Sequence, residues 1–263
     1  MASSMVLRAG AATDIGRVRQ HNEDSLLAED SLFVVADGMG GHAAGEVASG
    51  IVVETMAGLL HRERLRPEDL VAGLAECNAR ILQSVARHPE QTGMGTTATG
   101  LAVVTAGGSD HWAVFNVGDS RVYRLLGGEL SLVTVDHSEV QEMVDAGLIT
   151  EQEAARHPLR NVVTRSLGTE TAPTPDVWVF PPHPGERFVL CSDGLSNELS
   201  REQIEQVVTE HDDPQQAAEA LVCAAVDAGG RDNVTVIVVA LDAGDEDDGD
   251  VDTAPRNGAG SGA

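Results

Sequence analysis

Six acidic residues are candidates for cation binding, and four of them stand next to a predicted strand with a glycine close by. Three end apolar runs, as in LFVVADG, AVFNVGDS and RFVLCSDG. A fourth directly precedes NVTVIVVAL, and an adjacent pair lies in RQHNEDS. A buried carboxylate is costly unless a proton or a cation neutralises it. In chain order these acids are Glu23, Asp24, Asp37, Asp119, Asp193 and Asp232.

Carboxylates that converge on one end of a sheet repel one another, so their recurrence favours a shared cation site. No cluster of cysteine or histidine accompanies them, and oxygen ligands select magnesium, manganese or calcium. A glycine next to an acid, such as Gly38 after Asp37, lets a backbone carbonyl approach the ion. Two ions bridged by one carboxylate can activate a water for attack on phosphorus. For each single Asp-Gly pair, the alternative is an ordinary turn.

Two glycine-rich loops each have two interpretations. DGMGGHAAGE (37–46) follows a strand and precedes a helix, as a phosphate cradle does, but it has neither G-x-x-x-x-G-K-[ST] nor G-x-G-x-x-G. A loop that keeps side chains clear of metal ions is therefore favoured over nucleotide binding. GMGTTATG (93–100) is either a plain turn into a strand or a loop that packs beneath the metal site.

Two basic side chains are candidates for chemistry around a phosphate. Arg19, four residues before Glu23, is either a surface arginine or a guanidinium fork that binds substrate phosphate. His42 is either a general acid for the leaving oxygen or a loop histidine that bonds to the backbone. Cys191 lies on a predicted strand with no histidine near it in sequence, which indicates a core thiol and not a nucleophile.

The composition excludes several classes of protein. Lys and Arg number 17 against 42 Asp and Glu, and the formal charge of −25 disfavours a nuclease or a binder of anionic lipid. Three widely spaced cysteines indicate reduced thiols in a cytoplasmic protein. The first residues lack the apolar stretch of a signal peptide, and no run of about 18 apolar residues predicts a membrane span.

The elements that must position these residues come as helix pairs and as antiparallel runs of strands. The order predicts an α+β fold with helix pairs packed outside stacked sheets. Capping boxes at Thr150 and Ser200 predict further helix starts. The tail 242–263 is acidic and glycine-rich, which predicts disorder. Helices are expected at 43–60, 66–88 and from 214 to near 229, strands at 32–36, 187–192 and 233–241, and a strand meander from about 96 to 135.

Eight ordered blocks of this sequence resemble the bacterial metal-dependent Ser/Thr protein phosphatases of type 2C, the PPM family. The resemblance runs from about residue 8 to about residue 240. It implies a four-layer α-β-β-α sandwich, with two antiparallel sheets flanked by helix pairs and a two-metal site at one end. It further implies a catalytic domain over 1–241 that precedes the tail. The blocks are RVRQHNEDS, VVADGMGGHAAGEVAS, GMGTT, VGDSRVY, DHS, HPLRNVVTRSLG, LCSDGLS and GGRDNVTV.

The resemblance also implies roles for single residues. Arg19 and Asp37 are expected to be catalytic, since Arg19 would bind the substrate phosphate and Asp37 would bridge two ions. Residues 137–170 correspond to a flap beside the site. Animal relatives carry a histidine where this chain has Met39, so His42 is a displaced candidate acid and a water at the metals is the alternative donor. The implied ligands are Asp37, the Gly38 carbonyl, Asp193 and Asp232, with Glu23 and Asp24 acting through water or at the second ion, and Asp119 sharing a third ion with Asp193.

The implied activity is hydrolysis of phosphoserine and phosphothreonine in proteins by a metal-activated water, without a covalent intermediate. Two or three Mg²⁺ or Mn²⁺ ions are the expected cofactors. Phosphorylated proteins, namely Ser/Thr kinases and their substrates, are the expected partners of a monomer. The alternatives are a catalytically idle phosphoprotein-binding domain and a partner-switch phosphatase that acts on anti-anti-sigma proteins.

Overall fold

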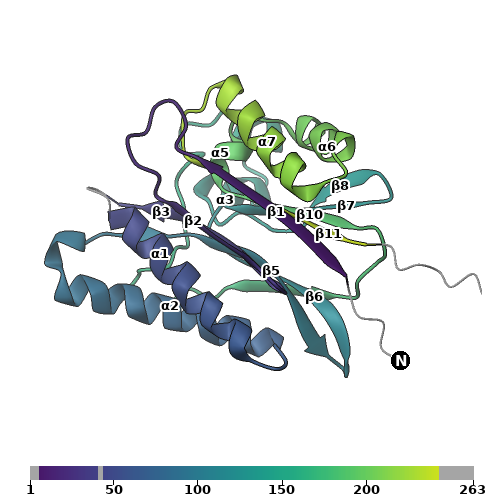
Figure 1. The fold of residues 1–263 in the computed structure, drawn as a ribbon. Helices are drawn as coiled ribbons and strands as arrows, with labels where there is room; N and C mark the ends of the chain where they lie inside the picture. The colour runs from purple at the N-terminus through teal and green to yellow at the C-terminus, as the bar shows by residue number, and fades with distance from the viewer. Residues whose placement is uncertain (1–5, 41–43, 243–263) are drawn as a thin grey trace, which may run out of the picture.

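Two antiparallel sheets lie face to face between two layers of helices (Figure 1), within residues 6–40 and 44–242, which the computed structural model describes. The first sheet runs in the order β1 (Leu7–Asp14), β11 (Val234–Leu241), β10 (Arg187–Cys191), β7 (Arg121–Leu126) and β8 (Glu129–Leu132). The second runs in the order β2 (Asp24–Glu29), β3 (Leu32–Met39), β5 (Ala98–Ala106), β6 (Ser109–Val117) and β9 (Asp176–Phe180), and the short β4 (Gly95–Thr96) pairs with β3. The predicted α+β sandwich is confirmed.

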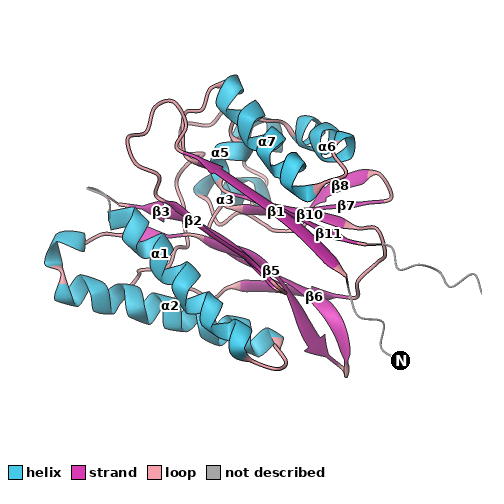
Figure 2. Cartoon of the chain, viewed as in Figure 1, coloured by secondary structure: helices cyan, strands magenta, loops and turns pink. Residues whose placement is uncertain are grey.

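Each sheet has its own pair of long helices on its outer face (Figure 2). The pair α1 and α2 packs on the second sheet, and α6 and α7 lie over the first. Three shorter helices lie in connections near the ends of the strands. The α-helices are α1 (Ala44–Ala57), α2 (Pro67–Arg87), α3 (Glu139–Asp145), α4 (Glu151–Ala154), α5 (Asp193–Ser196), α6 (Arg201–Glu210) and α7 (Pro214–Ala228), and 3₁₀ turns span Gly58–His61 and Pro89–Gln91.

Strand β3 shows why the sandwich has three separate apolar interfaces. Its side chains alternate between the two faces of the sheet, as the pleat requires. Val34 and Ala36 pack with helices α1 and α2, whereas Phe33 and Val35 pack between the two sheets. Strand β11 alternates in the same way between the helices α6 and α7 and the space between the sheets. Both β3 and β11 bury side chains on their two faces, which explains why these two runs are apolar nearly throughout.

Two expectations about the elements need correction. The predicted meander is not continuous, because β5 and β6 belong to one sheet while β7 and β8 belong to the other. Strands β1, β2 and β9 were not predicted, and β1 in particular reads LRAGAATD, which is poor in β-branched residues. The capping boxes at Thr150 and Ser200 are confirmed as starts of α4 and α6.

The described elements begin with β1 at Leu7 and end with β11 at Leu241. Most of the predicted acidic tail, residues 243–263, lies outside the described residues, as does His42. Among the helices of the described ranges, none combines the length and hydropathy that a bilayer span needs.

Candidate metal centre

One pocket, of about 230 Å³, gathers most of the acids that the sequence singles out. The strands that lead to it belong to both sheets, so residues far apart in the chain meet at one end of the sandwich. Asp24 does not line this pocket, although its pKa responds to the acids that do. The predicted site residues that line it are Arg19, Glu23, Asp37, Gly38, Asp119, Asp193 and Asp232.

Asp24 and Asp37 are directly opposite each other on the neighbouring strands β2 and β3. The Ser192 hydroxyl donates to Asp24 Oδ2 at 2.8 Å, but Asp24 Oδ1 is buried without a hydrogen-bond partner. Burial, together with the charges of Asp193 and Asp232, raises the pKa of Asp24 to about 7. The groups around Asp24 therefore do not fully stabilise the negative charge of its carboxylate.

Asp37 is fixed through its backbone by the loop that follows α2. Its amide donates to Thr97 Oγ1, and its carbonyl accepts from the Thr97 amide and from the Thr96 hydroxyl, all at 2.9 Å. Burial raises the pKa of Asp37 well above its usual range, and the charge of Asp24 adds to this effect. The interpretation of GMGTTATG as a loop that packs beneath the acids is therefore correct.

Gly38 is required by close approach of the backbone. A Cβ atom at this position would lie 2.3 Å from the carbonyl oxygen of Gly45 and 2.4 Å from that of Glu23. No side chain fits there, so the glycine after Asp37 allows β3, the loop before β2 and the first turn of α1 to meet.

The first sheet contributes Asp193 and Asp232. Asp193 follows β10 at the first turn of α5, where Asn197 Nδ2 donates to its Oδ2 at 3.0 Å. Burial and the charge of Asp232 raise the pKa of Asp193 to about 6. Asp232 is separated from the start of β11 by Asn233, and its Oδ2 accepts from Arg19 Nη2 at 2.6 Å. The arginine expected at the phosphate is thus held beside the acids.

Asp119 lies in the turn at which the chain passes from the second sheet to the first. The preceding residue, Gly118, has a φ of +114°, and a Cβ there would lie 2.5 Å from the side chain of Thr97. Asp119 is only 8% exposed. Burial, with the charges of Asp193 and Asp136, raises its pKa to about 7. The crossing between the sheets therefore brings Asp119 to the same pocket as Asp37, Asp193 and Asp232.

The donor set suits a hard divalent cation. It consists of carboxylate and backbone oxygens, and behind the pocket Asp24 Oδ1 is buried without a hydrogen-bond partner among the described residues. Raised pKa values at Asp24, Asp37, Asp119 and Asp193 show that the protein alone does not stabilise these charges. In the described ranges, no three Asp, Glu, His or Cys side chains are close enough together to coordinate one ion as they stand.

Several pocket residues were missed in the sequence. Thr97 lies within a loop whose packing role had been considered, but its contact with Asp37 had not. Asn233, beside Asp232, donates to the carbonyls of Ile15 and His21 at 3.0 Å and accepts from the Glu23 amide at 2.9 Å. It therefore fastens the loop that carries Arg19 and Glu23. The segment 137–170 adds two lining residues, Asn161 and Val163, which lie in the block HPLRNVVTRSLG but had been given no role of their own.

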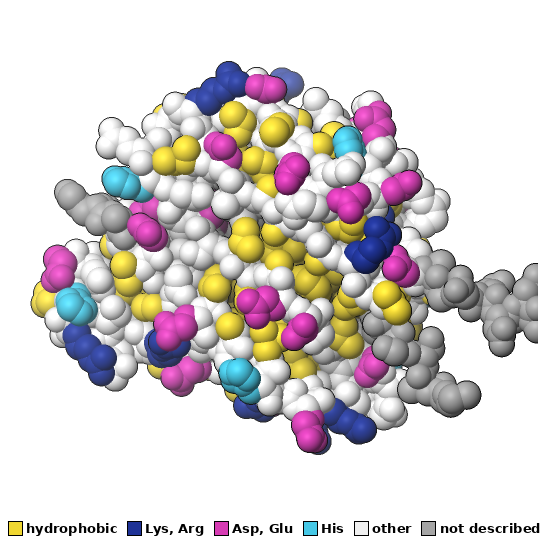
Figure 3. Space-filling model, in the orientation of Figure 1, with side chains coloured by type: hydrophobic (Ala, Val, Ile, Leu, Met, Phe, Trp, Pro, Cys, Tyr) yellow, Lys and Arg dark blue, Asp and Glu magenta, His cyan; other side chains and the backbone are white. Residues whose placement is uncertain are grey.

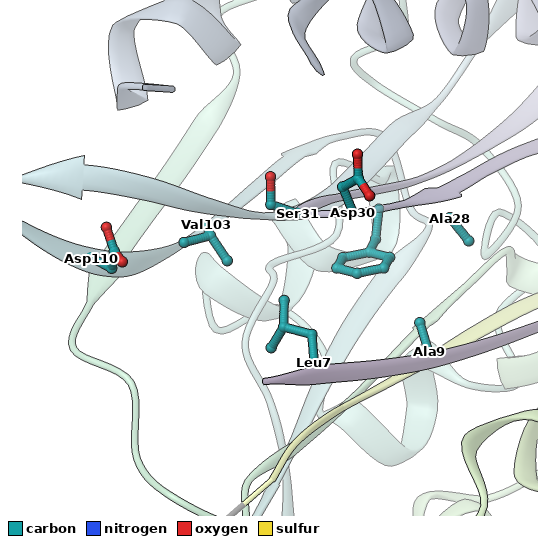
Figure 4. Close-up of a pocket in the computed structure, with 8 residues that line it drawn as sticks. Leu7, Ala9, Ala28, Asp30, Ser31, Val103 and Asp110 are labelled. Atoms are coloured by element: carbon teal, nitrogen blue, oxygen red, sulfur yellow. The ribbon is translucent and has the colours of Figure 1, made fainter. Parts of the chain in front are cut away.

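A second, larger pocket of about 530 Å³ lies between the edge strands of the two sheets. Figure 3 shows hydrophobic side chains gathered over this part of the surface. Leu7 of β1 and Val103 of β5 approach it from opposite sheets, and the carboxylates of Asp30 and Asp110 point away from them (Figure 4). No converging acids or arginine line it, so the smaller pocket is the candidate for chemistry.

Comparison with known proteins matches the geometry to a family. The family model described as Protein phosphatase 2C matches residues 16–224. The chain is 42% identical over 241 residues to the serine/threonine protein phosphatase PstP of Mycobacterium tuberculosis, covering 89% of this chain and 45% of PstP. It is 34% identical to the serine/threonine phosphatase stp of Listeria monocytogenes, covering 90% of this chain and 96% of that protein. The chain thus spans about half the length of PstP and nearly all of stp.

Solved structures agree with this match. The catalytic domain of PstP in complex with two manganese ions superposes with a TM-score of 0.83 at 38% identity, covering 91% of this chain and 100% of that one. A phosphatase from Mycobacterium smegmatis in complex with cacodylate gives a TM-score of 0.81 at 38% identity, with 91% and 100% covered. The order of the strand-end acids, the two-sheet sandwich and these matches lead to one conclusion: the chain belongs to the protein phosphatase 2C family.

Proposed function

We propose that this chain hydrolyses phosphoserine and phosphothreonine in proteins, with divalent metal ions as cofactors. The observation that carries the proposal is the convergence of Asp37, Asp119, Asp193 and Asp232 with Arg19 in one pocket. The family match and the names of the relatives support it. An idle binding domain is not favoured, because neither the acids nor the arginine has been lost.

The residues that would hold the ions are Asp37, Asp193, Asp232 and the carbonyl of Gly38, with Glu23 and Asp24 near the second ion. Asp119 and Asp193 would share a third. The ions would lower the pKa of an attacking water and offset the charge on the phosphoryl oxygens. Two ions are expected by analogy with the manganese complex of PstP, and Mg²⁺ or Mn²⁺ suits the all-oxygen donor set.

Arg19 is the residue of this chain that would bind the substrate phosphate. Its guanidinium side chain is 49% exposed and points one nitrogen at Asp232. Hydrogen bonding to Asp232 raises the pKa of Arg19, so it stays a cation at any working pH. A guanidinium presents several donors, so Arg19 can meet a phosphate through nitrogens that Asp232 does not occupy. The orientation of the phosphate relative to the acids would then be set by this contact.

Replacement of one acid tests the assignment. Asp193→Asn keeps the shape of the side chain and removes its charge, and Asp110→Asn, in the second pocket, is the matched control. On a phosphopeptide with manganese, we expect the first variant to lose more than about a hundredfold in kcat, the scale of losing one fixed electrostatic group. The control should match wild type. Full activity in Asp193→Asn would contradict the metal assignment.

For the whole protein, we propose a chemical class of substrates and partners. Phosphorylated proteins, including Ser/Thr kinases and their targets, are the proposed partners, and the cytoplasm is the proposed location of a monomer. A parallel incubation with a DNA fragment, with and without chelator, tests the nuclease alternative. Cleavage of the DNA fragment would contradict the proposal, which the charge of −25 already makes unfavourable for nucleic acid.

A further inference from the structure

His137, the first residue of the flap, is nearly fully buried and bonds to the turn that carries Asp119. Its side chain and backbone together are only 4% exposed. The His137 amide donates to the Gly118 carbonyl at 2.9 Å, and the Gly118 amide donates back to His137 Nδ1 at 3.1 Å. This reciprocal pair holds Gly118 in its left-handed conformation directly before Asp119.

The other ring nitrogen of His137 faces a different part of the chain. Because Nδ1 accepts a hydrogen bond, the ring proton belongs on Nε2, an assignment that follows from the bonding partners. Nε2 then donates to Asp176 Oδ2 at 3.1 Å, at the first residue of β9. Arg165, near the end of the flap, brings its Nη1 to 3.2 Å from His137 Nε2 and to 3.3 Å from the other oxygen of Asp176. Because Nε2 carries the ring proton, the Arg165 donor bonds to Asp176 and not to the ring. Asp176 therefore joins His137 to the returning arm of the flap.

The backbone around His137 ties the two arms of the flap together. Its carbonyl accepts from the Thr164 amide at 2.8 Å, and Ser138 forms a β-bridge with Val163. Val163 and Asn161, on either side of Val162 in the chain, line the pocket of acids. The position of these two pocket residues thus depends on the same short segment that holds Gly118.

A chain of hydrogen bonds continues from the Asp119 turn to Asp37. The Ser120 hydroxyl lies 2.8 Å from Thr97 Oγ1, which accepts from the Asp37 amide. On the flap side, Asp136 accepts two hydrogen bonds from Arg121, at 2.9 and 2.6 Å. The segments 118–121 and 136–137 are therefore joined at both of their ends.

We infer that His137 is a positioning residue that couples the flap to the Asp119 turn through its two ring nitrogens. Nδ1 sets the turn that presents Asp119 to a metal ion, and Nε2 sets the arm that presents Asn161 and Val163 to a substrate. The inference rests on the proposed phosphatase function for its consequence, but the coupling itself is a property of the fold. His137 does not line the pocket of acids, so it would act through Gly118 and Asp176.

Two conservative substitutions separate the two contacts. In His137→Asn the amide oxygen can replace Nδ1 as acceptor for Gly118, but nothing reaches Asp176. In His137→Gln the amide nitrogen can replace Nε2 as donor to Asp176, but the acceptor for Gly118 is lost. His137→Ala removes both contacts. His111→Ala, on β6, is the matched control, since within the described ranges the His111 ring forms a hydrogen bond only with the Ser109 carbonyl.

Two measurements on the full chain test the two contacts separately, and neither of them depends on enzymatic activity. Trypsin cleavage after the exposed Arg156 and Arg160, followed by mass spectrometry, reports opening of the flap. Calorimetric titration with manganese reports the metal site. We expect His137→Asn to be cleaved about tenfold faster with little change in manganese affinity, and His137→Gln to bind manganese about tenfold more weakly with little change in cleavage. His137→Ala should show both effects.

The result that would overturn the inference is a folded set of variants with both readouts within about twofold of wild type, or a loss of thermal stability alone, which marks a merely structural residue. If His137→Ala does not fold, the Asn and Gln variants decide. Activity of wild type on a phosphopeptide is measured separately. An inactive wild type would contradict the proposed function, while the cleavage pattern would still test the coupling.

Discussion

Asp24 and Asp37 occupy directly opposite positions on β2 and β3, so the sheet places two carboxylates of like charge side by side. Directly opposed like charges destabilise a sheet. One oxygen of Asp24 is in addition buried without a partner. The protein therefore gives up stability beside the proposed metal site, a common relation between a functional site and the fold that carries it.

The stability of the chelator-treated protein should fall as the pH rises. The pKa is raised to about 7 for Asp24 and Asp119 and to about 6 for Asp193, whereas an unfolded aspartate titrates near pH ~3.9. Because the folded pKa lies above the unfolded one, the folded state binds more protons between these values, and stability is lost as the pH rises through them. Urea unfolding from about pH 5 to about pH 8 should show this fall. A flat or rising profile would contradict it, and manganese at the upper pH should restore the lost stability.

Removal of the Asp24 charge should stabilise the metal-free protein. Asp24→Asn ends the repulsion with Asp37, so the free energy of unfolding with chelator near pH ~8 should rise by about 1–2 kcal/mol. The same variant should lose activity with manganese, because it also removes a negative charge beside the proposed metal site. Asp110→Asn, an exposed acid on β6, should change stability by less than about 0.5 kcal/mol. Equal behaviour of the two variants would refute the proposed strain.

Arg19→Lys should weaken phosphate binding without unfolding the protein. Lysine keeps the charge but loses the planar fork that can meet Asp232 and a phosphate at once. We expect KM for a phosphopeptide to rise about tenfold, and Arg19→Ala to lose about a hundredfold in kcat/KM. Arg17→Lys is the control, because Arg17 is exposed and pairs with Asp227. Steady-state kinetics that do not distinguish Arg19 from Arg17 would argue against the assignment.

A buried ion pair at the far end of the sandwich should matter for stability alone. Glu186 is fully buried and accepts from Trp112 Nε1, from the His183 amide at 2.7 Å and from Arg124 Nε at 2.7 Å. Glu186→Gln removes the charge that Arg124 faces, so the free energy of unfolding should drop by about 3 kcal/mol, since breaking one side of a buried pair is costly. Urea unfolding followed by tryptophan fluorescence measures this loss. The kcat on a phosphopeptide should not change, and a changed kcat would show that the two ends of the sandwich are coupled.

Local patterns in the sequence predicted much of the site. The runs that become β3, β10 and β11 are apolar enough to be recognised as buried strands, and their acids follow or precede them within one or two residues. The helix caps at Thr150 and Ser200 were likewise predictable, because a cap is a contact within four residues. Strand β1 was missed because its alanines and glycines carry no such signal.

Residue types and spacing alone predicted which acids could bind a divalent cation and which runs would be buried. They also showed an arginine close in the chain to two of these acids. Which acids lie together in space depends on how the two sheets pair and pack. Asp119 reaches the pocket because the chain changes sheets at Gly118, and Asp24 faces Asp37 because β2 and β3 pair in one register. The contacts of His137 with Gly118 and Asp176 join positions 19 and 39 residues away from it. Such contacts depend on strand pairing and on the packing of two sheets, which periodicity within a single segment does not encode.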